Sequence, residues 1–109
     1  MGVKIGITDN IELVKNAASE NIERALEKIG LVAERYAKEN CPVDTGRLRN
    51  SITHQASGLE VYIGTNVEYA PYVELGALGR DPKPYLKPAV ENHIGEYQKI
   101  IEGELGGTK

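Results

Sequence analysis

The sequence predicts an α+β fold, in which a long N-terminal amphipathic helix packs on a small antiparallel sheet and a second helix follows at the C-terminus. Apolar residues recur at helical spacing over residues 9–40 and again over residues 85–102. Between these segments, apolar and polar residues alternate over residues 51–63, which is typical of strands with one buried face. A chain of 109 residues is long enough for one domain with a single core.

The N-terminal part is predicted to contain a short strand followed by the long helix. Residues 1–8 alternate between apolar and polar side chains, as a strand does. The helix is expected over residues 9–40, because Asp9 and Glu12 have the spacing of a capping box and apolar residues follow about every 3.6 residues. Gly30 is unfavourable inside a helix, so either the helix bends there or another backbone approaches closely.

Residues 41–76 are expected to form a turn, a β-hairpin and a short helix. Ser57 and Gly58 are the predicted hairpin loop. Pro71 suits the first turn of the short helix. In this register the pairs Ile52–Ile63, His54–Val61 and Ala56–Leu59 share the face that packs on the long helix.

The remaining segments are a loop, a helix and a tail. Residues 77–84 are rich in glycine and proline without periodicity, so they are predicted to be an exposed loop. A C-terminal helix is expected over residues 85–102, and residues 103–109 are expected to fray.

Composition narrows the function classes. The formal net charge of −3 argues against a protein that binds nucleic acid over much of its surface. Cys41 is the single cysteine, so no intrachain disulfide or cysteine-based metal site is expected, and the thiol is predicted to fill space in the core. The N-terminal segment has no apolar leader region and no run of residues is long enough to cross a bilayer, so we expect no membrane contact and a reducing, aqueous compartment.

Asp44, Thr45 and Gly46 form the tripeptide of aspartic protease active sites. A retroviral-type protease is about this long and carries one such tripeptide per subunit, so that a dimer brings two carboxylates to one shared proton. Arg47 and Arg49 count against this remote alternative, because cations lower the pKa of a neighbouring carboxyl and disfavour the shared proton. In the favoured interpretation the tripeptide is a structural turn, in which Asp44 caps the turn and Gly46 supplies a positive φ.

Other catalytic and binding chemistry finds little support. His54 and His93 are the only histidines, and neither has a second ligand at the spacing of a metal site; His54 is predicted to lie at the core edge. The glycines of residues 63–65 and 76–79 lack the spacing of phosphate-binding loops. The sequence therefore predicts a protein that is not an enzyme and has no cofactor and no metal site.

Three blocks of the sequence resemble, in order, the signatures of the phage head–tail joining or tail-completion (neck) proteins typified by the gene-ten product of a lambdoid phage. Residues 42–52 resemble the signature P-V-D-T-G-x-L-R-x-S-I, residues 63–76 resemble G-T-N-x-x-Y-A-x-x-V-E-x-G, and residues 84–89 resemble P-[FY]-L-[RK]-P-A. The chain departs from the family at Cys41, where alanine is more common, and in its compact loop over residues 76–84.

The resemblance implies a structural virion protein that joins or completes the tail at the head–tail interface of a tailed bacteriophage or prophage. It would be made in the cytoplasm of the bacterial host and reside in the tail or neck of the virion. The implied partners are further copies in a ring or other homo-oligomer, other neck, connector or tail proteins, and DNA in the channel through non-specific contact. A generic homo-oligomeric interaction module, paired through a sheet edge, is the alternative.

Tyrosines and charged residues in or beside these blocks are the candidate assembly contacts. Tyrosine is favoured at interfaces, and cations suit contacts with acidic subunits or DNA. The competing hypothesis is that the tyrosines close the core edge and the charges are only solvated. The candidates are Arg47, Arg49, Tyr62, Tyr69, Tyr72, Glu74, Arg80, Lys83 and Tyr85.

Overall fold

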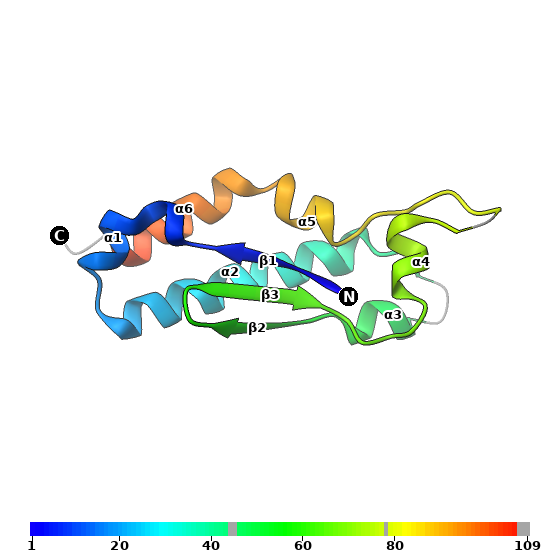
Figure 1. The fold of residues 1–109 in the computed structure, drawn as a ribbon, viewed down its shortest axis with the longest axis horizontal. Helices are drawn as coiled ribbons and strands as arrows, with labels where there is room; N and C mark the ends of the chain where they lie inside the picture. The colour runs from blue at the N-terminus through cyan, green and yellow to red at the C-terminus, as the bar shows by residue number, and fades with distance from the viewer. Residues whose placement is uncertain (44–45, 78, 107–109) are drawn as a thin grey trace.

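A computed structural model, which describes residues 1–43, 46–77 and 79–106, shows an α+β fold and confirms the predicted fold class (Figure 1). The molecule is elongated, with extents of 53 × 19 × 18 Å. Its elements in chain order are β1 (Gly2–Gly6), the 3-10 helix η1 (Thr8–Asn10), α1 (Ile11–Lys15), α2 (Ser19–Asn40), α3 (Arg47–Ser51), β2 (Thr53–Ser57), β3 (Glu60–Gly64), α4 (Ala70–Leu75), α5 (Lys87–Glu91) and α6 (Ile94–Leu105).

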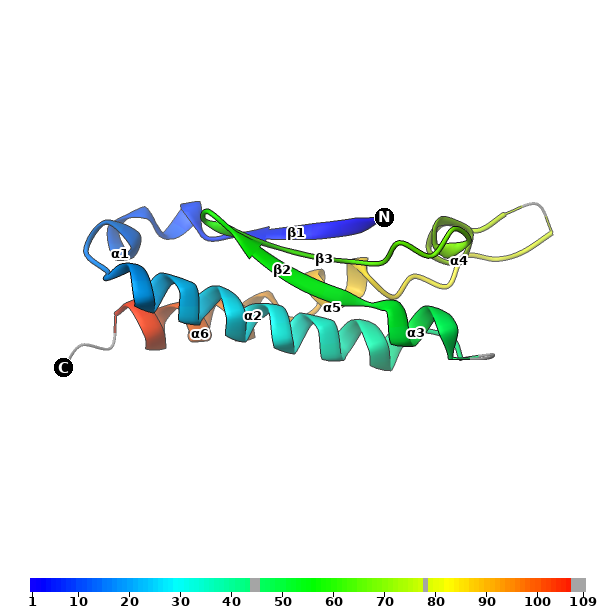
Figure 2. The ribbon, with the colours of Figure 1, turned by 90° about the horizontal axis from the view of Figure 1, so that it is seen from below.

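The three strands form one antiparallel sheet in the order β1-β3-β2, so that β3 is central. Figure 2 shows α2 and α6 on one side of this sheet and no helix layer on the other. Val61 and Ile63 point to the helices and are fully buried. Lys4, Tyr62 and Gln55 lie opposite one another on the outer face. This alternation is what a sheet with one solvated face requires.

The β2–β3 hairpin forms as predicted, but the predicted register is wrong by two residues. The loop consists of Gly58 and Leu59 rather than Ser57 and Gly58, so Ala56 lies opposite Val61. Gly58 has φ +62° and no other type of residue has a positive φ in the described chain, which fits glycine at the first loop position of a type II′ turn. A shift of two residues leaves the side chains within the strands on their predicted faces, whereas Leu59 lies in the loop.

The helix predicted over residues 9–40 is divided in the structure. The chain leaves helical geometry between Asn16 and Ala18, and the side-chain amide of Asn16 donates a hydrogen bond to the Glu12 carbonyl at 3.0 Å. Asp9 forms no capping hydrogen bond. The apolar stripe continues across the break because α1 folds back on α6, where the Gln98 amide donates to the Asn10 side chain at 2.8 Å. Tertiary packing therefore overrides the local periodicity.

The predicted helix over residues 85–102 is also divided, at Asn92 and His93. The backbone of His93 is not helical, with φ −131° and ψ 24°, and its ring stacks on Tyr36 of α2 with the ring centroids 3.5 Å apart. The expected fraying from residue 103 is wrong for residues 103–105, because α6 continues to Leu105, whose side chain is buried. Residues 107–109 of the predicted tail lie outside the described residues.

The sequence pattern missed α3, which lies where the chain was expected to enter the sheet directly. Leu48 anchors this short helix in the core, and the Ser51 hydroxyl donates back to the Leu48 carbonyl at 2.6 Å. The brief helix after residue 69 does form as α4, and Gly76, at φ +85°, ends it. Cys41 is buried as predicted, and burial raises the pKa of its thiol.

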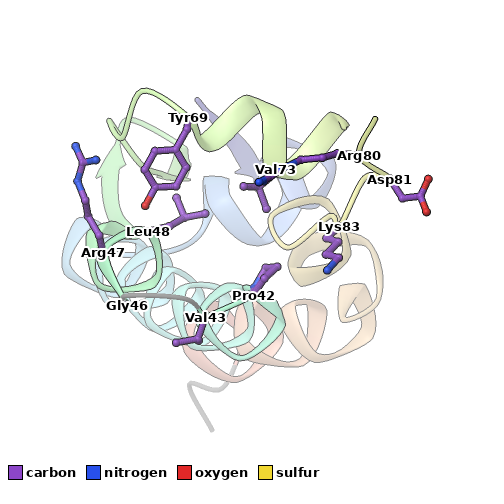
Figure 3. A pocket seen from close by; sticks show the side chains of 10 residues that line it. All are labelled: Pro42, Val43, Gly46, Arg47, Leu48, Tyr69, Val73, Arg80, Asp81 and Lys83. Carbon is purple, nitrogen blue, oxygen red and sulfur yellow. The ribbon is translucent and has the colours of Figure 1, made fainter. Parts of the chain in front are cut away.

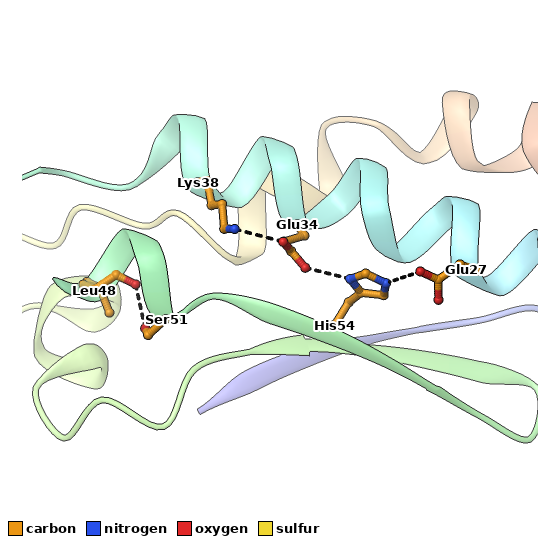
Figure 4. Close-up of polar contacts among 6 residues, drawn as sticks. All are labelled: Glu27, Glu34, Lys38, Leu48, Ser51 and His54. Carbon is orange, nitrogen blue, oxygen red and sulfur yellow. Dashed lines mark hydrogen bonds and ion pairs between the residues drawn. The ribbon is translucent and has the colours of Figure 1, made fainter. Parts of the chain in front are cut away.

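Gly30 makes room for a polar contact between α2 and the sheet (Figure 4). The His54 ring of β2 lies over Gly30, with Nδ1 2.7 Å from Glu34 and Nε2 2.9 Å from Glu27. A Cβ atom on Gly30 would overlap this ring and lie 2.8 Å from its Cγ atom and 3.0 Å from Val61. The close approach expected at Gly30 is therefore made by a side chain rather than by a backbone.

Replacing Gly30 with Ala is expected to lower the free energy of unfolding by about 1–3 kcal/mol, because the overlap with the His54 ring outweighs the gain in helix propensity. Gly95→Ala in α6 is the matched control: a Cβ atom there meets nothing within 4 Å, so stability should rise by about 0.5–1 kcal/mol. Urea denaturation followed by circular dichroism measures both. Shifts of the same sign would contradict this account of Gly30.

The two carboxylates give His54 a pH-dependent role in stability. Burial alone lowers the pKa of His54, but the hydrogen bonds with Glu34 and Glu27 outweigh burial and raise the pKa above its usual value of 6.5. Burial raises the pKa of Glu34, but His54 and Lys38 outweigh that effect and lower it. Both shifts favour the charged pair of imidazolium and carboxylate.

Because the folded-state pKa of His54 is raised, its contribution to stability is complete below pH 6.5 and is lost as pH rises through the folded-state pKa. We therefore expect the free energy of unfolding to fall with rising pH in this window, as measured by urea denaturation at several pH values. His54→Gln should abolish this slope, whereas His93→Gln should keep it. An unchanged slope in His54→Gln would assign the pH dependence to another group.

Candidate functional site

An open cleft of about 930 Å³ is lined by residues of α3 and α4 and of the segments beside them. These two helices lie at one end of the long axis (Figure 1). The walls of the cleft come from the segment after α2, from α3, from α4 and from the loop that follows α4 (Figure 3). Apolar surface is provided by the side chains of Leu48, Val73 and Tyr69, and charged groups surround it. The lining residues are Pro42, Val43, Gly46, Arg47, Leu48, Tyr69, Val73, Arg80, Asp81 and Lys83.

The wall formed by α3 depends on a left-handed residue. Gly46 has φ +87°, which confirms the predicted positive φ, and its carbonyl accepts the Asn50 N–H at 2.9 Å to start the helix. A side chain at this φ would be strained. Asp44 and Thr45, the rest of the predicted structural turn, lie outside the described residues.

Arg47 joins this wall to the segment before α4. Its guanidinium donates to both carboxylate oxygens of Glu68, at 3.0 and 2.9 Å, and lies 5.4 Å from the centroid of the Tyr69 ring. A backbone hydrogen bond and then Arg47 lower the pKa of Glu68. Both charged side chains are more than half exposed, so this pair shapes the rim of the cleft more than it stabilises the fold.

On the opposite side of the cleft, the buried Glu74 side chain of α4 holds the segment that leads into α5. One carboxylate oxygen accepts the backbone N–H groups of Tyr85 and Leu86, both at 2.9 Å, and the other accepts that of Lys87 at 3.1 Å. These N–H groups precede or begin α5 and have no partner within the helix, so the carboxylate completes the start of the helix. The Lys83 N–H also donates to the Val73 carbonyl at 2.8 Å. Both ends of the loop over residues 76–84 are therefore held against α4.

Residues 6–76 match the model of the family described as "Bacteriophage HK97-gp10, putative tail-component". This match covers more than half of the 109 residues. The chain belongs to the HK97-gp10-like family. No curated protein matches it. No solved structure matches it either.

Family membership confirms the resemblance to phage head–tail proteins and supports a structural role in a phage tail. The matched residues run from Gly6, the last residue of β1, through α4, and they include the parts of the cleft that come before Gly76 in the chain. The third resembling block, residues 84–89, lies beyond the match. It forms the segment whose backbone Glu74 binds.

The structure corrects two of the nine candidate contacts of this HK97-gp10-like protein. Glu74 is buried, and its carboxylate accepts backbone N–H groups of the segment that leads into α5. Tyr85 is fully buried in the core, and burial raises the pKa of its phenol. Its hydroxyl is the buried side-chain polar atom without a hydrogen-bond partner among the described residues. Neither side chain is available to a partner protein.

The other seven candidates fall into two groups. The cleft brings together Arg47, Tyr69, Arg80 and Lys83. Arg49, Tyr62 and Tyr72 are exposed but do not line it. Sequence reasoning missed Leu48, Val73 and Asp81 in the cleft. It also missed Leu75, which is 71% exposed on α4 beside Tyr72 at 59%. Two large apolar groups three residues apart, just before a helix-ending glycine, were the available signal.

In the described parts of the chain, no three side chains of the kinds that ligate metal ions are grouped for that purpose. Every helix that the structure describes is too short or too polar to cross a bilayer. The arrangement in the cleft is instead an apolar surface whose margin carries three cations, Arg47, Arg80 and Lys83, and one carboxylate, Asp81. Such a surface suits a segment that carries both apolar and acidic side chains.

Replacing Glu74 with Gln is expected to lower the free energy of unfolding by about 1–3 kcal/mol, because an amide nitrogen replaces one of the oxygens that accept two buried N–H groups and one partly buried N–H group. Glu68→Gln is the matched control, since its carboxylate lies at the surface, and it should change stability much less. Urea denaturation measures both. Equal effects would show that the buried hydrogen bonds of Glu74 do not govern stability at this end.

Proposed function

We propose that this chain is a structural subunit that joins or completes the tail at the head–tail interface of a tailed bacteriophage or prophage. It acts through self-assembly and protein–protein contacts, in the tail or neck of the virion, after synthesis in the cytoplasm of the bacterial host. Membership of a family of phage tail components supports the structural role. The observation that supports a joining role is the cleft at one end of the elongated molecule, where apolar, aromatic and charged side chains suited to binding a partner lie together.

The exposed groups at this end have the character of a protein interface. Tyr72 and Leu75 present apolar surface on α4, and the cleft adds the Tyr69 ring and arginine side chains. Aromatic residues and arginine are enriched at interfaces and supply much of their binding energy. Other neck, connector or tail proteins, as well as further copies of the chain, are the partners that we propose for this end. DNA in the channel is a further proposed partner of its cations, by non-specific contact.

The alternative function is a generic homo-oligomeric module that pairs through a sheet edge. The exposure of β2 favours this alternative, since it is an edge strand whose residues are nearly all exposed. Unpaired edge strands are templates for pairing with another chain. Loss of the protein in its parent phage distinguishes the two functions.

Deleting the gene from the parent phage or inducible prophage is expected to leave DNA-filled heads and separate tails, visible by electron microscopy, because the joining subunit is missing. The wild-type protein supplied in trans should restore joined virions. The double variant Tyr72→Ala, Leu75→Ala should restore few, whereas Ile94→Ala, which removes an exposed side chain from α6, should restore them fully. Normal yields of joined virions after deletion would refute the proposed function.

A further inference from the structure

Two of the described charged side chains without an intramolecular partner lie at the cleft. Ion pairs occupy much of the body, for example Lys4–Glu60, Arg24 and Lys28 with Glu104, and Lys38–Glu34. Within the described residues, the side chains of Arg80 and Lys83 at the cleft have no ion pair or hydrogen bond. Cations beside apolar surface that have no intramolecular partner are available to an acidic partner.

The opposite end of the same molecule has the complementary chemistry. Ile11 is 44% exposed at the start of α1, although most isoleucines of the chain are buried. Asp9 and Glu12 flank it, and both are exposed without an ion pair among the described residues. Glu20 in the first turn of α2 is exposed as well, and α1 carries one cation, Lys15.

The position of Ile11 is fixed by contacts on the other side of α1. Leu13 and Val14 pack on the core, and the Gln98 amide donates to Asn10. The turn that carries Asp9, Ile11 and Glu12 is therefore held in place without the use of these three side chains. An apolar residue between two carboxylates is thus presented at the surface of a fixed element.

We propose that this acidic turn, residues 9–12, binds in the cleft of a second copy of the chain, so that copies associate head to tail. Ile11 would contact the apolar surface of Tyr69 and Val73, and Asp9 and Glu12 would meet Arg80 and Lys83. The inference deepens the self-assembly of the proposed function and rests on it. The two surfaces lie at opposite ends of a 53 Å molecule (Figure 1), so one copy cannot satisfy its own cleft.

A contact between unlike surfaces leaves one cleft and one acidic turn free at the ends of each pair. It therefore continues to further copies, as a closed ring or an open row. The 19 × 18 Å cross-section keeps the contact smaller than the roughly 800 Å² per partner of a standard stable interface. We therefore expect a weak contact that salt weakens further, and cross-linking is the suitable measurement.

The test uses cysteines at the two surfaces. Ile11→Cys and Val73→Cys are combined in a Cys41→Ala background, and disulfide formation is followed on non-reducing gels. Since the two positions are too far apart to bridge within one copy, the expected product is a ladder of covalent oligomers. Pairing Val73→Cys with Ile94→Cys, on an exposed site outside the acidic turn, is the matched control and should give no ladder.

Charge reversal then tests the complementarity in the same background. Arg80→Glu with Lys83→Glu, or Asp9→Lys with Glu12→Lys, should each slow cross-linking by at least about tenfold, because like charges meet. The quadruple variant, in which both surfaces are reversed, should regain the ladder. Lys4→Glu with Lys99→Glu is the charge-matched control outside both surfaces and should leave it unchanged. Circular dichroism verifies that each variant is folded.

The head-to-tail contact would be overturned if the Ile11→Cys, Val73→Cys protein formed no more covalent oligomers than the Val73→Cys, Ile94→Cys control. Charge reversals without effect, or a quadruple variant that is not restored, would also overturn it. These outcomes are separate from failure of the proposed function, which is judged by joined virions after gene deletion. If sedimentation showed that the protein forms oligomers although no cross-linked ladder appears, self-assembly would be assigned to another surface, such as the edge of β2.

Discussion

The carboxylate of Glu74 is the interaction on which the cleft end depends. It binds three consecutive backbone N–H groups at the start of α5, from a short helix that has little core of its own. An unmet N–H group in this buried position would cost free energy comparable to a lost hydrogen bond, and here three would be unmet. By tying α4 to α5, Glu74 sets the distance between the two ends of the loop over residues 76–84. The position of this wall of the cleft therefore depends on hydrogen bonds of a buried side chain.

A second constraint is that α2 packs against both the sheet and α6. Its buried residues include Ala25, Gly30, Ala33 and Ala37, whose small size lets neighbouring elements approach closely. The space over Gly30 is filled by the His54 ring, and the two carboxylates on α2 complete its hydrogen bonds. The same absence of side-chain volume that weakens Gly30 as a helix former therefore permits the main polar contact between helix and sheet.

Sequence reasoning predicted the elements whose pattern reflects burial on one face. Alternation placed β2 and β3, and the helical stripe placed α2, because local period and tertiary environment agree there. It failed at residues 16–18 and 92–93, where an apolar stripe continues although the chain turns to pack on a distant element. At the site, Gly46 and the exposed cations were predictable from residue type. The burial of Glu74 was not, because its partners are backbone groups more than ten residues away that carry no side-chain signature.

The course of α2 and the strands along the long axis also has a mechanical consequence. At about 1.5 Å per residue, the 22 residues of α2 span roughly 33 Å of the 53 Å length. The three strands run close to the direction of the long axis (Figure 1). Because the chain leaves β1 at Gly6 and β3 at Gly64, at opposite ends of their ladder, a pull between the two ends of the molecule loads the β1–β3 hydrogen bonds in shear, where all of them resist together. A pull along the long axis should therefore meet more resistance than a pull across the sheet, which would break the hydrogen bonds of a ladder one after another.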